Sequence, residues 1–202
     1  MPAGPDGTTA IWVQLSHAGR QSTGKVNLSP VAPSAVPLQG IPSLAIGKPT
    51  AMAHDEIAAL PARFAAAAAV CKGAGFTGVH IHAAHGYLLS SFLNPRANVR
   101  GDAYGGALAA RSKVLLDVVD ATRAAVGPSF PVCVKLNSAD FQSGGLTEEE
   151  AVRRRVLRVL PLFETDLNLN QKLNQILNQI GTILLILLLR FQLGYRQLFV
   201  VN

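Results

Sequence analysis

Short apolar segments and longer amphipathic segments alternate along the first three quarters of the chain. Residues 11–16 (IWVQLS), 77–82 (TGVHIH) and 130–137 (FPVCVKLN) are short and apolar, and each predicts a buried strand. Residues 54–72 and 108–126 carry apolar residues at helical spacing, which predicts helices. Strands that alternate with helices are typical of parallel βαβ units, either in a barrel or in a doubly wound sheet.

Local signals indicate where these elements begin and end. Gly73 and Gly75 follow the first helical pattern and predict its end. Pro61 lies inside the same pattern and predicts a kink there or two shorter helices. Thr147 and Glu150 form a T-x-x-E capping box, which predicts the start of a further helix.

Two segments do not follow the alternation. Residues 24–50 are rich in Pro, Ser and Gly, and they predict a long connection of the kind that is often functional. Residues 161–202 form a tail dominated by Leu, Ile, Asn and Gln, in which residues 167–189 have the spacing of an amphipathic helix. The apolar run 183–189 is shorter than the roughly 20 residues of a membrane span, so we expect a buried helix face and no membrane partner.

Polar residues stand at the carboxyl end of each predicted strand, where an α/β barrel places its active site. They are Gln14 and His17, His82 and His85, and Lys135 and Asn137. The chain contains neither G-x-G-x-x-G nor G-x-x-x-x-G-K-[ST], so no nucleotide fingerprint favours the doubly wound sheet. A complete barrel needs about 250 residues. Because the chain has 202 residues, the pattern favours part of a barrel.

Composition narrows the class of protein. Apolar residues make up 49% of the chain and charged residues 15%, which excludes a disordered chain. The net charge is +6, but the basic residues are scattered without interleaved aromatics, so we expect no nucleic-acid partner. Cys71 and Cys133 have no metal-ligand or redox spacing, and the amino terminus has no secretory pattern; we therefore expect a cytoplasmic protein.

The segment 80–106 (HIHAAHGYLLSSFLNPRANVRGDAYGG) carries most of the candidate chemistry. His80 and His82 share one face of the predicted strand, because side chains alternate across a strand. An H-x-H pair on a strand can bind a metal, so a metal-dependent hydrolase that uses His80 and His82 is one hypothesis. No further histidine follows His85, and we expect no metal site.

A proton-transfer site is the second interpretation of this segment. His82 and His85 lie at the strand end beside a glycine and can together bind an oxygen that gains negative charge during a reaction. Tyr87 follows two residues later and can donate a proton to a strong carbon base. We interpret His80 as a packing residue of the barrel interior.

Three ordered motifs resemble the old yellow enzyme family of FMN-dependent NAD(P)H:flavin oxidoreductases. They are VQLSHAGRQ, then GFTGVHIHAAHGYLLSSFLNPRANVRGDAYGG with Arg111, then VCVKLNSADF, and the similarity runs from about Ile11 to about Val152. The resemblance implies a partial (β/α)8 TIM barrel, containing about strands three to five with their helices. It also implies bound FMN, NAD(P)H as the reductant and an electron-poor alkene as the substrate.

The resemblance also implies roles for individual residues. Gln14 matches the glutamine that binds the flavin pyrimidine edge, and Lys135 matches the basic residue near flavin N1 and O2. His82 and His85 match the pair that binds the substrate's carbonyl or nitro oxygen, and Tyr87 matches the tyrosine that protonates the α-carbon. A loop and helix start match positions that we interpret as scaffold: Arg96, Asn98, Arg100, Asp102, Tyr104, Gly105, Gly106 and Arg111.

The chain also departs from the family pattern. His80 stands where the family usually has glutamate, and Ser16 where an aromatic is common. Strands expected before residue 11 and after residue 160 are not found, so we interpret residues 1–160 as a truncated barrel domain and residues 161–202 as an atypical helical tail. The alternative function is therefore a non-catalytic fragment or interaction protein that self-associates through exposed barrel edges.

Overall fold

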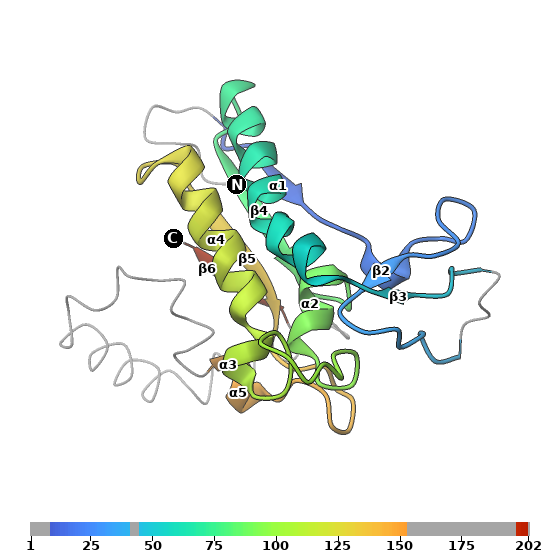
Figure 1. The fold of residues 1–202 in the computed structure, drawn as a ribbon. Helices are drawn as coiled ribbons and strands as arrows, with labels where there is room; N and C mark the ends of the chain where they lie inside the picture. Colours follow the sequence, from blue (N-terminus) through green and yellow to red (C-terminus); the bar gives the residue numbers. More distant parts are fainter. Residues whose placement is uncertain (1–8, 41–44, 153–196, 202) are drawn as a thin grey trace.

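The computed structural model describes residues 9–40, 45–152 and 197–201. Its main sheet has four strands in the order β1-β4-β5-β6 (Figure 1). The first three, β1 (Trp12–Leu15), β4 (Gly78–Ala83) and β5 (Val132–Asn137), are parallel to one another. All three strands that the hydrophobic pattern predicts are therefore confirmed.

Two helices, α1 (His54–Gly73) and α4 (Lys113–Val126), lie side by side across one face of this sheet (Figure 1). Val79 and Ile81 of β4 and Val134 of β5 are buried against them in one apolar core. Because side chains alternate along a strand, His80 and His82 lie on the opposite face, as predicted. Within the described residues the helices cover only the first face, which is the arrangement of a barrel rather than of a doubly wound sheet.

The apolar stripe of α1 explains why Pro61 does not divide it. The helix is a single element with Pro61 inside it, so of the two predicted alternatives the division into two shorter helices is wrong, and the kink stays a prediction. Ile57 and Leu60 before the proline and Phe64 after it are all buried in the same core. Their packing holds the chain helical across the backbone hydrogen bond that proline lacks.

The second predicted helix, residues 108–126, is divided into α3 (Leu108–Arg111) and α4. The division falls at the fully buried Ser112, whose hydroxyl donates to the Leu108 carbonyl at 2.6 Å. A serine that bonds back to the preceding turn competes with regular helix geometry. The stripe of apolar residues on α4 is nevertheless buried as the spacing predicts.

The remaining short elements surround the sheet. They are η1 (Gly19–Gln21), the parallel pair β2 (Val31–Ala32) and β3 (Thr50–Ala51), α2 (Leu88–Leu93) and α5 (Glu148–Val152). The predicted capping box of α5 is confirmed in both directions. The Glu150 N–H donates to Thr147 Oγ1 at 3.1 Å, and the Thr147 N–H donates to Glu150 Oε2 at 3.3 Å.

The last described residues correct part of the prediction for the tail. Residues 197–201, expected to be helical, form strand β6 (Gln197–Val201), which pairs antiparallel with β5. Their sequence, QLFVV, has the valine and aromatic content of a strand, and pairing satisfies backbone groups along the edge of β5. The expected helix over 167–189 lies outside the described residues.

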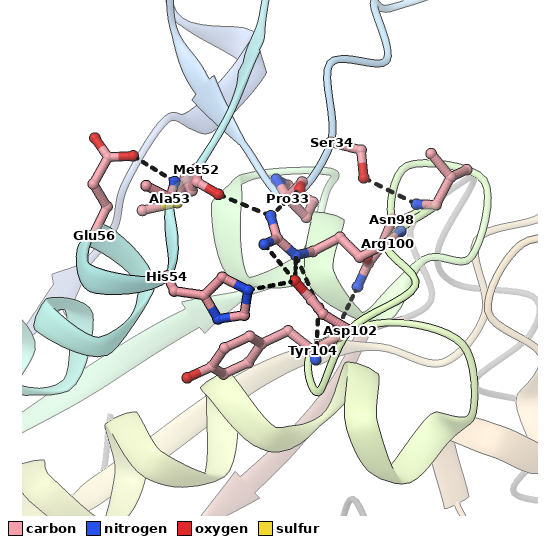
Figure 2. Close-up of polar contacts among 11 residues, drawn as sticks. Pro33, Ser34, Met52, Ala53, His54, Glu56, Asn98, Arg100, Asp102 and Tyr104 are labelled. Carbon is pink, nitrogen blue, oxygen red and sulfur yellow. Dashed lines mark hydrogen bonds and ion pairs between the residues drawn. The ribbon is translucent and has the colours of Figure 1, made fainter.

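A polar network ties the loop between α2 and α3 to the β2–β3 segment (Figure 2). Arg100 forms an ion pair with Asp102 (Nη2–Oδ2 2.5 Å) and donates through Nη1 to the carbonyls of Pro33 and Met52, both at 2.8 Å. The hydrogen bond from Arg100 lowers the pKa of Asp102 to about 2, and His54 Nε2 lies 3.1 Å from the same carboxylate. These contacts support the scaffold interpretation for Arg100 and Asp102, which anchor the loop to β2–β3 and to the start of α1.

Arg111 is the second anchor of this region and is only 4% exposed. Its Nε donates to the Gly106 carbonyl at 2.9 Å, and its Nη1 donates to the Leu93 carbonyl. Its Nη2 lies 2.6 Å from Glu150 Oε1. One buried guanidinium therefore joins the ends of α2 and α3 to α5.

Candidate functional site

The residues expected to form the site gather at the carboxyl ends of the parallel strands. In the sheet register, Gln14 of β1 is opposite His80, and His82 of β4 is opposite Lys135 of β5. These positions share the face of the sheet that α1 and α4 leave uncovered. The fold thus brings the predicted cofactor residues and the predicted substrate residues to one edge, and it places His80 between them.

His82 is the most enclosed of the site histidines, with 3% of its surface exposed. The backbone N–H of Ala84 donates to its Nδ1 at 3.3 Å, so the neutral ring carries its proton on Nε2. Burial, reinforced by His85, Lys135 and His80, lowers the pKa of His82 to about 4. Near pH 7 the residue is therefore a neutral imidazole that offers one N–H donor.

The rings of His85 and Tyr87 both pack against the ring of His82. The His82 and His85 rings are 5.1 Å apart between centroids and nearly perpendicular, and the Tyr87 ring centroid is 4.9 Å from that of His82. Burial also lowers the pKa of His85, with Lys135 as the second cause. Two neutral imidazoles and a phenol in contact form a set of hydrogen-bond donors with no formal charge.

The folded protein should lose stability as the pH falls from about 6.5 towards 4. Burial lowers the pKa of four histidines, so the unfolded chain binds more protons than the folded chain in this range. They are His17, His80, His82 and His85. From its pKa of about 4, His82 alone contributes up to roughly 3 kcal/mol of this loss. Urea unfolding near pH 7 and near pH 5 measures how steeply the free energy of unfolding falls with pH.

His82→Gln supplies the control for this pH dependence, because glutamine does not titrate. The variant should show a shallower fall of the free energy of unfolding between the two pH values than the natural chain does. An equal slope in both proteins would contradict the assignment of His82 as a buried neutral base.

The turn that carries His85 is held by side chains from two other loops. The His85 N–H donates to Asn137 Oδ1 at 3.1 Å, and the His85 carbonyl accepts from Gln21 Nε2 at 2.5 Å. Asn137 was visible in the sequence as a polar residue at a strand end. Gln21 lies in the motif VQLSHAGRQ, but nothing in its local sequence predicts a contact 64 positions away.

The residues expected to contact FMN have a donor set that fits a flavin ring edge. Gln14 is exposed, Lys135 is half-buried, and both lie on the uncovered face of the sheet. The glutamine amide both donates and accepts, which suits the alternating donors and acceptors of a pyrimidine edge. The lysine ammonium donates and carries the charge that suits an anionic ring. Gln14 and Lys135 therefore remain the residues that would hold the cofactor.

Neither a metal centre nor a membrane helix is found in the described part of the chain. Within residues 9–40 and 45–152, no group of three or more His, Cys, Asp or Glu side chains is placed to hold a metal ion. Within the same part, no helix has both the length and the apolar character needed to cross a membrane.

Comparison with known proteins defines the class to which this fold and site belong. The family model of the NADH:flavin oxidoreductase / NADH oxidase family matches residues 6–171. The chain is 38% identical to an NADH oxidase of Thermoanaerobacter brockii over 142 residues, which cover 69% of this chain and 21% of that protein.

Two solved structures support the same assignment. An old yellow enzyme homologue from Zymomonas mobilis superposes with a TM-score of 0.64 at 32% identity. The superposed part is 77% of this chain and 45% of the homologue. Morphinone reductase superposes with a TM-score of 0.60 at 33% identity, over 70% of this chain and 41% of the reductase. These neighbours are TIM barrels, and the parallel strands β1, β4 and β5 with their helices are part of such a barrel.

The chain belongs to the NADH:flavin oxidoreductase / NADH oxidase family, the family of old yellow enzyme, whose members depend on FMN and take electrons from NAD(P)H. It spans between 20% and 41% of the length of the curated relatives that it matches.

Proposed function

We propose that the protein is an FMN-dependent oxidoreductase of the ene-reductase type, which reduces an alkene activated by a carbonyl or nitro group. The observation that carries the proposal is the uncharged donor cluster of His82, His85 and Tyr87, with Lys135 opposite His82 and Gln14 opposite His80 on the same face of the sheet. We further propose that it acts in the cytoplasm, where reduced nicotinamide dinucleotides are available.

The roles follow from the chemistry of each side chain. FMN, when bound, supplies the hydride that NAD(P)H provides and that the β-carbon of the alkene accepts. The His82 Nε2–H and the imidazole of His85 hydrogen-bond the substrate oxygen and stabilise the negative charge that develops on it. Tyr87 gives a proton to the α-carbon, so that one hydride and one proton complete the saturated product. Gln14 and Lys135 hold and polarise the flavin edge.

Neutral imidazoles suit this task because each can offer an N–H donor without a formal charge that would be costly to bury. His82 has a pKa of about 4 and stays neutral across the physiological range. Its donor strength therefore does not change with pH above about 5. The burial of His82 also strengthens the hydrogen bond that it donates to the developing oxyanion.

The visible spectrum of the purified chain tests the proposal. The protein should retain FMN after incubation and removal of free flavin, and anaerobic NADH or NADPH should bleach the flavin absorbance. An added enone should then restore it. Gln14→Ala should weaken FMN retention, whereas Gln39→Ala, at an exposed position away from the strand ends, should not.

The second candidate is a non-catalytic interaction protein, which one observation favours. Within the described residues β1 has a paired strand on one side only, and such an edge can pair with another chain. A protein that stays colourless with added FMN and elutes as a dimer or larger species would support this candidate and overturn the first.

A further inference from the structure

His85 has a backbone conformation that side-chain-bearing residues rarely adopt. Its φ is 61°, and that of the following Gly86 is 74°, so two consecutive residues are left-handed. For a residue with a Cβ this conformation costs about 1–3 kcal/mol, and it persists only where the surroundings hold it. The contacts of the His85 peptide groups therefore decide where its imidazole lies.

Both backbone polar groups of His85 are bonded to side chains from other loops. Asn137, at the end of β5, accepts the His85 N–H at 3.1 Å. Gln21, in η1 after β1, donates to the His85 carbonyl at 2.5 Å. The turn after β4 is thus held from both sides, by Gln21 in the segment that follows β1 and by Asn137 at the end of β5; we call this pair of contacts the clamp.

Asn137 is itself held in the orientation that this contact requires. Its Nδ2 donates to Asp140 Oδ1 at 3.0 Å, which leaves Oδ1 facing the His85 N–H. The other oxygen of Asp140 accepts from the Leu146 N–H at 3.0 Å. The amide of Asn137 therefore cannot turn over without breaking both bonds.

Gln21 reaches His85 because two glycines leave room. A Cβ on Gly86 would lie 2.8 Å from Gln21 Nε2, in the space that the amide now occupies. A Cβ on Gly19 would lie 2.9 Å from the Leu88 Cα, and the Leu88 N–H donates to the His17 carbonyl at 3.0 Å. The loop after β1 is docked on the start of α2, and this docking delivers Gln21 to the turn.

We propose that Gln21 and Asn137 are positioning residues for substrate binding, which hold His85 in its left-handed conformation so that its imidazole lies beside that of His82. Released from either contact, His85 returns to the favoured region of negative φ, and its ring leaves the pair. This proposal rests on the proposed function, since it specifies how the oxygen-binding histidines of that site are held in place.

Gln21→Met tests the clamp, because methionine has a similar length but no donor. Three quantities are measured in the full chain: amide hydrogen exchange at His85, the Kd for 2-cyclohexen-1-one with FMN present, and the Kd for FMN. We expect exchange at His85 to accelerate about 10-fold or more and the Kd to rise about 10-fold. The Kd for FMN should stay unchanged. Gln39→Met, at an exposed position, is the matched control and should alter none of the three.

A second variant and a double-mutant cycle make the test independent of one substitution. Asn137→Ala removes the acceptor on the other side of the same residue and should accelerate exchange at His85 in the same way. His85→Gly removes both the strain of positive φ and the imidazole that the clamp positions, so Gln21→Met should add no further loss of enone affinity in that background.

The outcomes separate this proposal from the function on which it rests. Unchanged exchange at His85 in both variants would overturn the clamp, and faster exchange with an unchanged enone Kd would overturn its role in substrate binding. If the natural chain binds FMN but no enone, the proposed function fails together with the role in binding. The exchange rates then still decide whether the two side chains hold His85.

Discussion

Replacing Tyr87 with phenylalanine should slow the reduction of an enone by about 100- to 10,000-fold while flavin reduction by NAD(P)H proceeds at its original rate. The ring of Tyr87 packs 4.9 Å from that of His82, and phenylalanine preserves this contact while it removes the hydroxyl. Only the step that needs a proton at the α-carbon is therefore affected. Anaerobic stopped-flow absorbance measures the two half-reactions separately.

The control for this experiment is Tyr104→Phe. Tyr104 lies in the scaffold loop, where its ring packs against His54 and Lys113 rather than against the site histidines. It should leave both half-reactions unchanged. Loss of both half-reactions in Tyr87→Phe, or no change in either, would show that Tyr87 is not the proton donor.

Replacing Arg111 with methionine should have the largest effect on folding, a loss of about 3–5 kcal/mol in the free energy of unfolding. The guanidinium is 4% exposed and satisfies the carbonyls of Leu93 and Gly106 and the carboxylate of Glu150. Methionine fills part of the volume but leaves these three acceptors without their donor. Urea denaturation followed by circular dichroism measures the loss.

Lys113→Met is the control, because it removes an ion pair at an exposed position and so shows how much stability is lost without burial. Lys113 pairs with Asp117 at 2.6 Å, but the lysine side chain is 46% exposed, so its removal should cost less than about 1 kcal/mol. Comparable losses in the two variants would contradict the view that Arg111 acts as a buried anchor.

Several features of the fold follow from local sequence. The strands and the stripe of α4 follow from the spacing of apolar residues, and the start of α5 follows from the chemistry of Thr147 and Glu150. At Pro61 and at residues 197–201, tertiary contacts override the structure that the local sequence predicts. The burial of apolar residues before and after Pro61 keeps α1 a single helix. Residues 197–201, predicted to belong to a helical tail, form a strand because they pair with β5.

The candidate site could likewise be predicted from the sequence only in part. The alternation of a strand was enough to place His80 and His82 on one face, and the resemblance of three motifs was enough to indicate the family. The burial of His82, which is the largest cause of its low pKa, and its place opposite Lys135 depend on tertiary packing and on a register between β4 and β5 that no local pattern specifies.

The sequence by itself determined the three parallel strands, the two long helices between them, their order and the residue types at each strand end, because these depend on spacing and side-chain chemistry within a few positions. Only the tertiary structure decided that His85 is left-handed and that Gln21 and Asn137 hold it. Those hydrogen bonds join residues 64 and 52 positions apart, and they form only once parallel pairing has brought the ends of β1, β4 and β5 to the same edge of the sheet.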